Sequence, residues 1–177
     1  VVLVILAIVA FMSIDWIAKQ GVEKGAGYAM GVGVTAGSVD VNVFGEEGVA
    51  IDALAVDNPE GFSKTPFLRV SESRVTMPFK NIMADKVDVS TFRLSGIEIS
   101  IESAGGKSNY GVIAERLKRF QSEKKADAPG KRYVFQKIEI EKITVTTRLA
   151  AGPLQTPTMP FEVKGVTLAD VGGKDGA

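Results

Sequence analysis

Ser122 and Lys125 have the spacing of a catalytic pair in which a lysine activates a serine nucleophile. Such a lysine must be desolvated to lose its proton, whereas this one lies in the charged tract SEKKADAPGKR. The chain contains no cysteine and no histidine. These absences exclude a thiol nucleophile, a Ser-His-Asp triad and metal sites built from thiolate or imidazole within this chain. We therefore expect the chain not to be an enzyme.

Two further patterns have the composition of ligand sites. The glycine-rich segment GVGVTAG, residues 31–37, departs from the phosphate-loop spacing and leads from a helix into a strand, so no helix N-terminus faces a phosphate. Glu46, Glu47 and Asp57 lack the spacing of a calcium loop and are typical of solvated turns. Glu139 and Glu141 alternate with isoleucines, as on the wet face of a strand. The sequence predicts no catalytic, cofactor-binding or metal-binding residue.

The charge balance argues against nucleic acid as a partner. The chain has 177 residues, with 21 Lys+Arg against 21 Asp+Glu. One basic face is expected on a helix and its following tract, with no interleaved aromatic residues that could stack on bases; it comprises Arg116, Lys118, Arg119, Lys124 and Lys125. Two interpretations are open for this face: it is simply solvated, or it contacts phospholipid head groups or an acidic partner.

The N-terminal residues read as a membrane anchor. Residues 1–14, VVLVILAIVAFMSI, are apolar apart from Ser13, and a span needs about 20 such residues. With Trp16 at the interface and a few residues expected before Val1, the predicted anchor is lined by Val1, Leu3, Ile5, Leu6, Ile8, Phe11, Ile14, Trp16 and Ile17. A cleaved signal peptide and a buried core helix are the alternatives. The run continues as helix to about Met30, and its flank of Asp15, Lys19, Glu23 and Lys24 is neutral, so charge does not predict orientation.

From Val32 onward the pattern is typical of β-structure. An eight-residue motif with apolar residues at its first, third, sixth and eighth positions recurs at residues 49–56, 87–94, 138–145 and 161–168, and residues 68–75 match it at three of four apolar places. Because side chains alternate along a strand, the reversal of parity in the middle of each copy needs a β-bulge or a sharp bend; an ordinary half-buried sheet is the simpler alternative. The apolar positions predict a groove or core containing Ile51, Leu54, Val89, Phe92, Ile140 and Ile143.

Further strands are expected at residues 32–43, 73–79 and 97–101, and one amphipathic helix over about residues 109–123. Ser108 and Asn109 offer its N-cap, and Tyr110, Ile113, Leu117 and Phe120 form its apolar stripe. DNPEGF, residues 57–62, predicts a turn, and SAGGKSN, residues 103–109, a flexible loop.

The order of these pieces resembles the N-terminal part of AsmA-like proteins, which are bacterial envelope proteins anchored in the inner membrane. The resemblance covers roughly residues 1–168, and its most telling pieces are the NPEGF turn after an L-x-V strand and the GGKSN entry to the helix. It implies a periplasmic, β-rich body without catalytic residues. In larger relatives, long curved sheets with an apolar groove are associated with lipid transfer and outer-membrane homeostasis.

The predicted architecture is a single N-terminal transmembrane helix followed by a mainly antiparallel, curved or bulged β-sheet domain with one amphipathic helix. Residues 1–18 form the anchor, residues 19–31 a juxtamembrane helix, and residues 32–177 a periplasmic AsmA-like β domain. Two functions are open. One is a non-catalytic accessory subunit or scaffold of an inner-membrane assembly, such as a respiratory or photosynthetic complex, in which the apolar positions close into a core. The other is a lipid-handling or envelope-maintenance protein in which they form an open groove. We expect membrane lipids and inner-membrane subunits as partners, and no cofactor.

Overall fold

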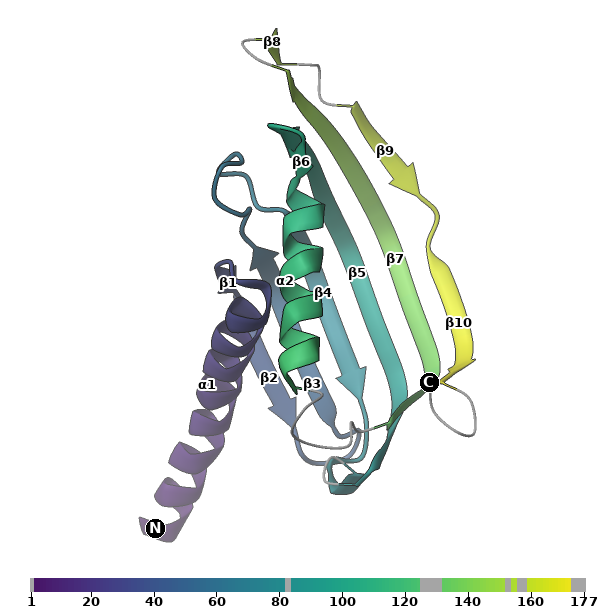
Figure 1. The fold of residues 1–177 in the computed structure, drawn as a ribbon. Helices are drawn as coiled ribbons and strands as arrows, with labels where there is room; N and C mark the ends of the chain where they lie inside the picture. The colour runs from purple at the N-terminus through teal and green to yellow at the C-terminus, as the bar shows by residue number, and fades with distance from the viewer. Residues whose placement is uncertain (1, 82–83, 125–131, 152–153, 156–158, 173–177) are drawn as a thin grey trace.

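The structure is a computed structural model that describes residues 2–81, 84–124, 132–151, 154–155 and 159–172. It consists of two α-helices, a short 3-10 helix and a β-sheet (Figure 1). In chain order the elements are α1 (Val2–Met30), β1 (Val34–Thr35), β2 (Ser38–Asn42), β3 (Gly48–Val56), β4 (Leu68–Thr76), the 3-10 helix (Phe79–Asn81), β5 (Lys86–Ala104), β6 (Lys107–Ser108), α2 (Asn109–Lys124), β7 (Arg132–Ala151), β8 (Leu154–Gln155), β9 (Met159–Val163) and β10 (Val166–Val171).

The strands form one open sheet in the order β1-β3-β4-β5-β7-β10, with β2 beside β3 and β9 beside β7. All neighbouring strands are antiparallel except β5 and β7, which run parallel over their whole paired length. The prediction of a β-rich, mainly antiparallel sheet with one amphipathic helix after the N-terminal helix is therefore confirmed. The parallel pair was not predicted; it requires a crossover connection, and α2 lies within that connection.

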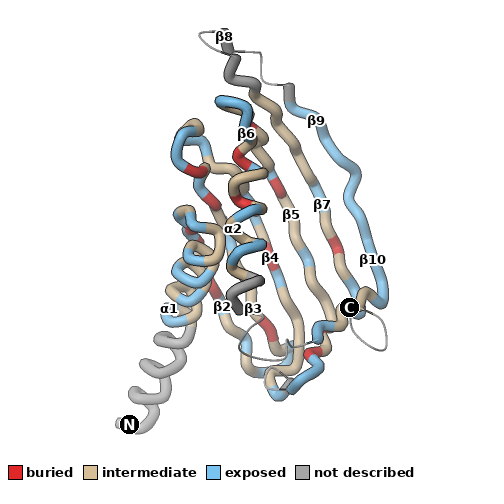
Figure 2. The backbone as a smooth tube through the Cα atoms, viewed as in Figure 1, coloured by how far each residue is buried: buried red, intermediate tan, exposed pale blue. Residues whose placement is uncertain are grey.

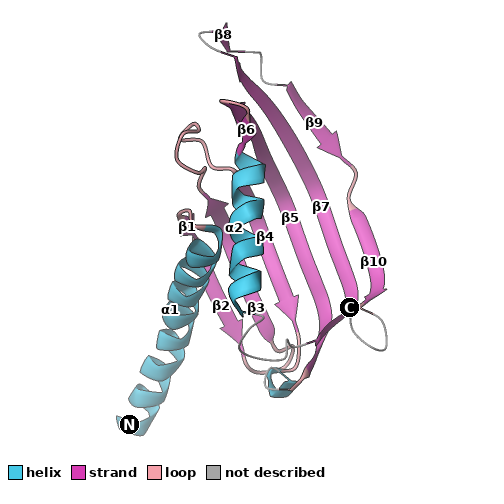
Figure 3. Ribbon diagram, in the orientation of Figure 1, coloured by secondary structure: helices cyan, strands magenta, loops and turns pink. Residues whose placement is uncertain are grey.

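Both helices lie on the same side of the sheet. α2 lies in front of β4 and β5, whereas β7, β9 and β10 extend past it with no helix in front of them (Figures 1 and 3). α1 lies along the opposite edge, beside β1 and β2, and meets α2 through an edge-to-face contact of Tyr28 with Phe120 at 5.8 Å. The helices therefore cover the first half of the sheet and leave the second half open.

One line of residues interrupts the strands at the same level. The cross-strand register omits Ala53, Ser71, Gly96 and Lys142, although the pairing on both sides of each omission keeps the same offset. No strand therefore holds an extra residue. Ala53, Gly96 and Lys142 have left-handed φ angles of 50°, 65° and 54°. We call this line the crease.

The crease accounts for the reversal of parity in the copies of the motif at residues 49–56, 68–75, 138–145 and 161–168, whose middles lie at this level. The copy at residues 87–94 reverses at Ser90, where the register of β5 with β7 has a second gap, opposite Gln136. Val70 and Ser73 are both buried although they are three residues apart on either side of it, so they do not follow the alternation of a regular strand. The interruptions between β1 and β2, at residues 36–37, and between β9 and β10, at residues 164–165, fall at the same level. A one-residue bulge is excluded at the crease because the register keeps its offset there. The strands are not divided by a sharp bend either, because β3, β5 and β7 each continue through the crease and each carries one residue of positive φ at that level.

Most local predictions agree with the structure. α1 ends at Met30, and Gly31, with φ of 65°, follows it as a C-cap, so the glycine-rich segment leads from helix to strand. α2 spans Asn109–Lys124, and the amide of Gly111 donates to Ser108 Oγ at 3.0 Å, which identifies Ser108 as its N-cap. The flexible loop expected at residues 103–109 is wrong. Because Gly105 and Gly106 both adopt positive φ, the chain makes a tight hairpin between β5 and β6.

Most buried residues belong to the first half of the sheet and to the start of α2 (Figure 2). Those of apolar type are Val34, Ala36, Val39, Val56, Val70, Val87, Val89, Ile97 and Ile113. Ile113 comes from α2 and the remaining eight come from β1 to β5 or the residues beside them. The core is therefore built by short aliphatic side chains under the two helices.

No helix in the described part of the chain is long and apolar enough to cross a membrane. Of the residues predicted to line an anchor, Trp16 and Ile17 are exposed. The side chains of the others lie outside the described residues: Val1, Leu3, Ile5, Leu6, Ile8, Phe11 and Ile14.

Candidate functional site

The six residues predicted for a groove or core occupy one face of the sheet. Cross-strand partners share a face, and the register joins Ile51 and Leu94 through Ser73, and Leu94 directly to Ile140. On the other side of the crease, the register joins Leu54, Val70, Ile97 and Ile143 in the same way. Phe92 follows at the next level of β5, and Val89 follows beyond the second gap in the register, at Ser90.

Five of the six predicted residues are only partly buried. Val89 is buried, whereas Ile51, Leu54, Phe92, Ile140 and Ile143 are half-buried. The ring of Phe92 lies 6.0 Å from that of Phe135 on β7. The face is therefore neither a fully closed core nor a fully open groove.

β9 and β10 extend the apolar face beyond the cover of α2. Phe161, Val163, Val166 and Leu168 pair with Val145, Ile143, Ile140 and Ile138 of β7, respectively. All four side chains on β9 and β10 are 41–49% exposed. The sequence contained this signal, because the four are the apolar positions of the last copy of the repeated motif. We call these four residues and their four partners on β7 the open strip.

The opposite face of the sheet is charged. Glu139, on β7, accepts hydrogen bonds from Arg93 Nε at 2.9 Å and Nη2 at 2.7 Å, and pairs with Lys137 through its other oxygen. These contacts, the one from Lys137 foremost, hold the pKa of the Glu139 carboxyl below its usual range. Glu139 lies on the polar face as expected, but it is only 8% exposed because its two cations cover it.

α1 is joined to the sheet edge by three charged side chains. Asp15 Oδ1 accepts from the amide of Val41 at 2.8 Å, and Glu23 Oε1 accepts from the amide of Ala36 at 2.9 Å. Between them, Lys19 Nζ donates to the carbonyl of Gly37 at 3.0 Å. Because Asp15, Lys19 and Glu23 are four residues apart, they lie on one side of the helix and satisfy backbone groups that would otherwise template another strand. From the sequence alone, these residues were predicted only to form a neutral flank of the anchor.

A buried polar cluster joins the two motifs that carry the family resemblance. Asn109, fully buried at the start of α2, donates through Nδ2 to Asn58 Oδ1 at 2.8 Å and to the carbonyl of Ser100 at 2.7 Å. Asn58, from the NPEGF turn, also donates to Glu102 at 3.3 Å, and Glu102 accepts from the amide of Ser63 at 3.0 Å. The described side chains leave no buried nitrogen or oxygen atom unpaired. We therefore assign this cluster a structural role, holding the turn against the helix.

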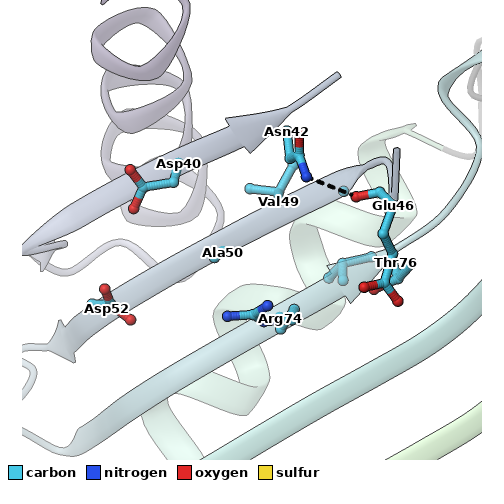
Figure 4. A pocket seen from close by; sticks show the side chains of 10 residues that line it. Asp40, Asn42, Glu46, Val49, Ala50, Asp52, Arg74 and Thr76 are labelled. Carbon is cyan, nitrogen blue, oxygen red and sulfur yellow. Dashed lines mark hydrogen bonds between the residues drawn. The ribbon is translucent and has the colours of Figure 1, made fainter. Parts of the chain in front are cut away.

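The remaining candidate residues form no catalytic arrangement. A hollow of about 320 Å³ lies on the first strands, where Asp40, Asp52 and Arg74 project from β2, β3 and β4 (Figure 4). Ser38 donates to both aspartates, and in the described part of the chain no three acidic residues are placed to hold a metal ion. Glu47 accepts from the backbone of Phe79 and so ties two loops together.

The basic residues of α2 differ in their contacts and exposure. Arg116 reaches back to α1 and donates to the carbonyl of Gly31 at 2.5 Å, which caps that helix, while Lys118 and Arg119 are exposed. The side chains of Ser122 and Lys124, and all of Lys125, lie outside the described residues.

Comparison with known proteins adds no relative. No protein-family model matches this sequence, and no curated protein matches it significantly.

Proposed function

We propose that this chain is a non-catalytic, membrane-anchored lipid-handling protein of the AsmA-like type, located in the bacterial inner membrane with most of its chain in the periplasm. The open strip carries this proposal. Eight apolar side chains form a band two strands wide, and the four on β9 and β10 keep 41–49% of their surface exposed. An exposed apolar band of this kind is typical of a surface that binds an apolar ligand or partner.

The direction of the strip favours lipid acyl chains as the occupant. β2 runs toward the end of the molecule at which α1 begins, and β7 starts and β10 finishes at that same end (Figure 1). The strip therefore begins at the end of the sheet at which α1 begins, on the edge of the sheet opposite α1 (Figure 1). Between Ile138 and Val145 it extends along β7 for about 23 Å at the rise of an extended strand. An acyl chain leaving the bilayer would meet apolar side chains along this whole path.

The accessory-subunit function is the second candidate, and the shape of the strip favours it. The strip is an uncovered sheet face ending at the edge strands β9 and β10, so an apolar surface of a neighbouring subunit could cover it. Pro160, on β9, lacks the amide that strand addition would use, so a partner is expected to pack on the face and not to extend the sheet.

The test uses the full-length chain purified in mild detergent, with a fluorescent phospholipid as the probe. Leu168→Glu places a charge within the strip, whereas Thr167→Glu places the same charge on the opposite face of the same strand. Burying a leucine side chain contributes about 1.5–3 kcal/mol, so Leu168→Glu should weaken binding about tenfold or more while Thr167→Glu leaves it unchanged.

Two outcomes would contradict the lipid proposal. Equal binding by the two variants would show that the strip does not hold the lipid. Mass spectrometry of the purified sample provides the second outcome: stoichiometric membrane proteins without enriched phospholipid would establish the accessory-subunit function instead.

A further inference from the structure

The contacts of α1 define which end of the β domain faces the N-terminal apolar segment. Along α1 the bonded residues run from Asp15 to Glu23, and along β2 their partners run backward from Val41 to Ala36. α1 and β2 therefore point in opposite directions. The residues that follow Val41 lie beyond Asp15, at the level of the apolar segment.

The turn between β2 and β3 presents an aromatic side chain at this end. Phe44 is 73% exposed. Its amide donates to Asn42 Oδ1 at 3.3 Å, and Asn42 Nδ2 donates to the carbonyl of Glu46 at 3.1 Å, so the turn is held by the end of β2. Trp16, which follows Asp15 on α1, is 64% exposed. Tryptophan favours the membrane–water interface because its ring has a polar N–H group, and phenylalanine is one of the apolar side chains that insert into the boundary between head groups and acyl chains.

A second loop lies against this turn. Met77 donates its amide to the carbonyl of Glu47 at 3.0 Å, and Met77, Pro78 and Lys80 share the lining of one hollow with Gly45 and Glu47. In the described residues of these two loops, apolar side chains are combined with one exposed lysine, Lys80, and three acidic residues, Glu46, Glu47 and Asp85. This charge balance does not favour a strongly anionic surface.

We propose that the β2–β3 turn inserts Phe44 into the head-group region of a zwitterionic phospholipid bilayer, beside Trp16. This inference rests on the proposed anchor, because the same bilayer holds residues 1–14. It adds a second point of contact, so the β domain is oriented on the membrane and does not swing on α1. The open strip then begins at the bilayer surface.

The chain contains one tryptophan, Trp16, and this allows the depth of chosen positions to be measured one at a time. Full-length protein is reconstituted into phosphatidylcholine vesicles whose acyl chains are brominated near the head group, and quenching of tryptophan fluorescence is recorded. The natural protein reports on Trp16. The variant Trp16→Phe with Phe44→Trp reports on the turn. The matched control, Trp16→Phe with Tyr28→Trp, reports on an exposed aromatic position twelve residues further along α1, about 18 Å away along the helix axis.

We expect Trp16 and the Phe44→Trp reporter to be quenched to a similar extent and the Tyr28→Trp reporter not to be quenched. Quenching of Trp16 without quenching of the Phe44→Trp reporter would overturn the insertion of the turn and leave the anchor standing. Quenching of neither would overturn the anchor and the insertion together. Far-UV circular dichroism of each variant verifies that it is folded, and the Phe44→Tyr variant with Trp16 retained supplies a conservative folded reference.

Discussion

Gly96 is the residue at which the crease depends most directly on a missing side chain. It adopts φ of 65°, and a Cβ atom added there would lie 2.4 Å from Ser71 Oγ and 2.7 Å from Ser71 Cβ. Ser71 belongs to the neighbouring strand β4, and its hydroxyl donates to the carbonyl of Gly96 at 3.3 Å. The two strands therefore approach each other closely because one of them carries no side chain at this point.

The cost of Gly96→Ala has two parts. A left-handed φ costs a non-glycine residue about 1–2 kcal/mol. Forcing extra volume against a packed neighbour costs about 1–3 kcal/mol more. We expect the free energy of unfolding to fall by about 2–5 kcal/mol in total.

Gly105→Ala is the matched control, because Gly105 has φ of 59° and no atom lies within 4 Å of an added Cβ. The free energy of unfolding of Gly105→Ala should fall only by the cost of the left-handed backbone, about 1–2 kcal/mol. Adding Ser71→Gly to Gly96→Ala removes both clashing atoms and should recover the difference between the two single variants. The measurement is urea unfolding of the full chain in detergent, followed by far-UV circular dichroism, with comparison of midpoints at equal slope.

Two results would refute this reasoning. If Gly105→Ala lost as much stability as Gly96→Ala, the contact with Ser71 would contribute nothing. If Ser71→Gly failed to recover stability in the double variant, the neighbouring strand would not be the source of the cost.

Three further predictions concern other parts of the sheet. Lys142→Gly relieves a left-handed φ of 54° and should raise the free energy of unfolding by up to about 1 kcal/mol in urea titrations. The pKa of Glu139 is lowered in the folded protein, so its carboxylate stabilises the fold at pH values above the ordinary glutamate pKa of about 4.3. This stabilisation is lost as the pH falls through the lower pKa of the folded state. In thermal unfolding, Glu139→Gln should therefore make the melting temperature fall less steeply as the pH is lowered. Asp15→Ala should speed hydrogen exchange at the Val41 amide, which loses its acceptor.

Each of these three predictions has its own control and contrary result. The control for Lys142→Gly is Lys137→Gly, which removes another lysine of β7 at a position without positive φ and should not stabilise the protein. Equal stabilisation by the two variants would show that relief of the left-handed backbone at Lys142 is not the cause. If the melting temperature of Glu139→Gln fell with pH as steeply as that of the natural protein, the loss of stability in acid would have to come from other carboxylates. Unchanged exchange at Val41 would mean that α1 does not protect this edge, whereas Lys24→Ala, on the same helix, serves as the neutral comparison.

Local features of the fold could be predicted from the sequence because their causes are local. The start of α2 follows from the hydroxyl of Ser108, and the end of α1 follows from Gly31. The four full copies of the repeated motif fall on β3, β5, β7 and the pair β9 and β10, and the apolar positions of the motif identified one face, including Ile140 and Ile143. The reversal of parity was visible too, but its physical cause depends on the register with neighbouring strands and on the backbone conformation of single residues, which the sequence pattern of one strand does not contain.

The tertiary structure decided the features that depend on distant residues meeting. In the sequence, Asp15 and Glu23 are only charged residues next to an apolar segment. Their carboxylate oxygens accept hydrogen bonds because the fold places the backbone amides of Val41 and Ala36 beside them. The openness of Phe161 and Leu168 depends on where α2 lies, and a sequence pattern does not state which part of an apolar face a helix will cover. Composition and periodicity thus determined the elements and their apolar face. The packing of those elements decided which part of that face is core and which part is left open, because burial is a property of the whole fold and not of any one segment.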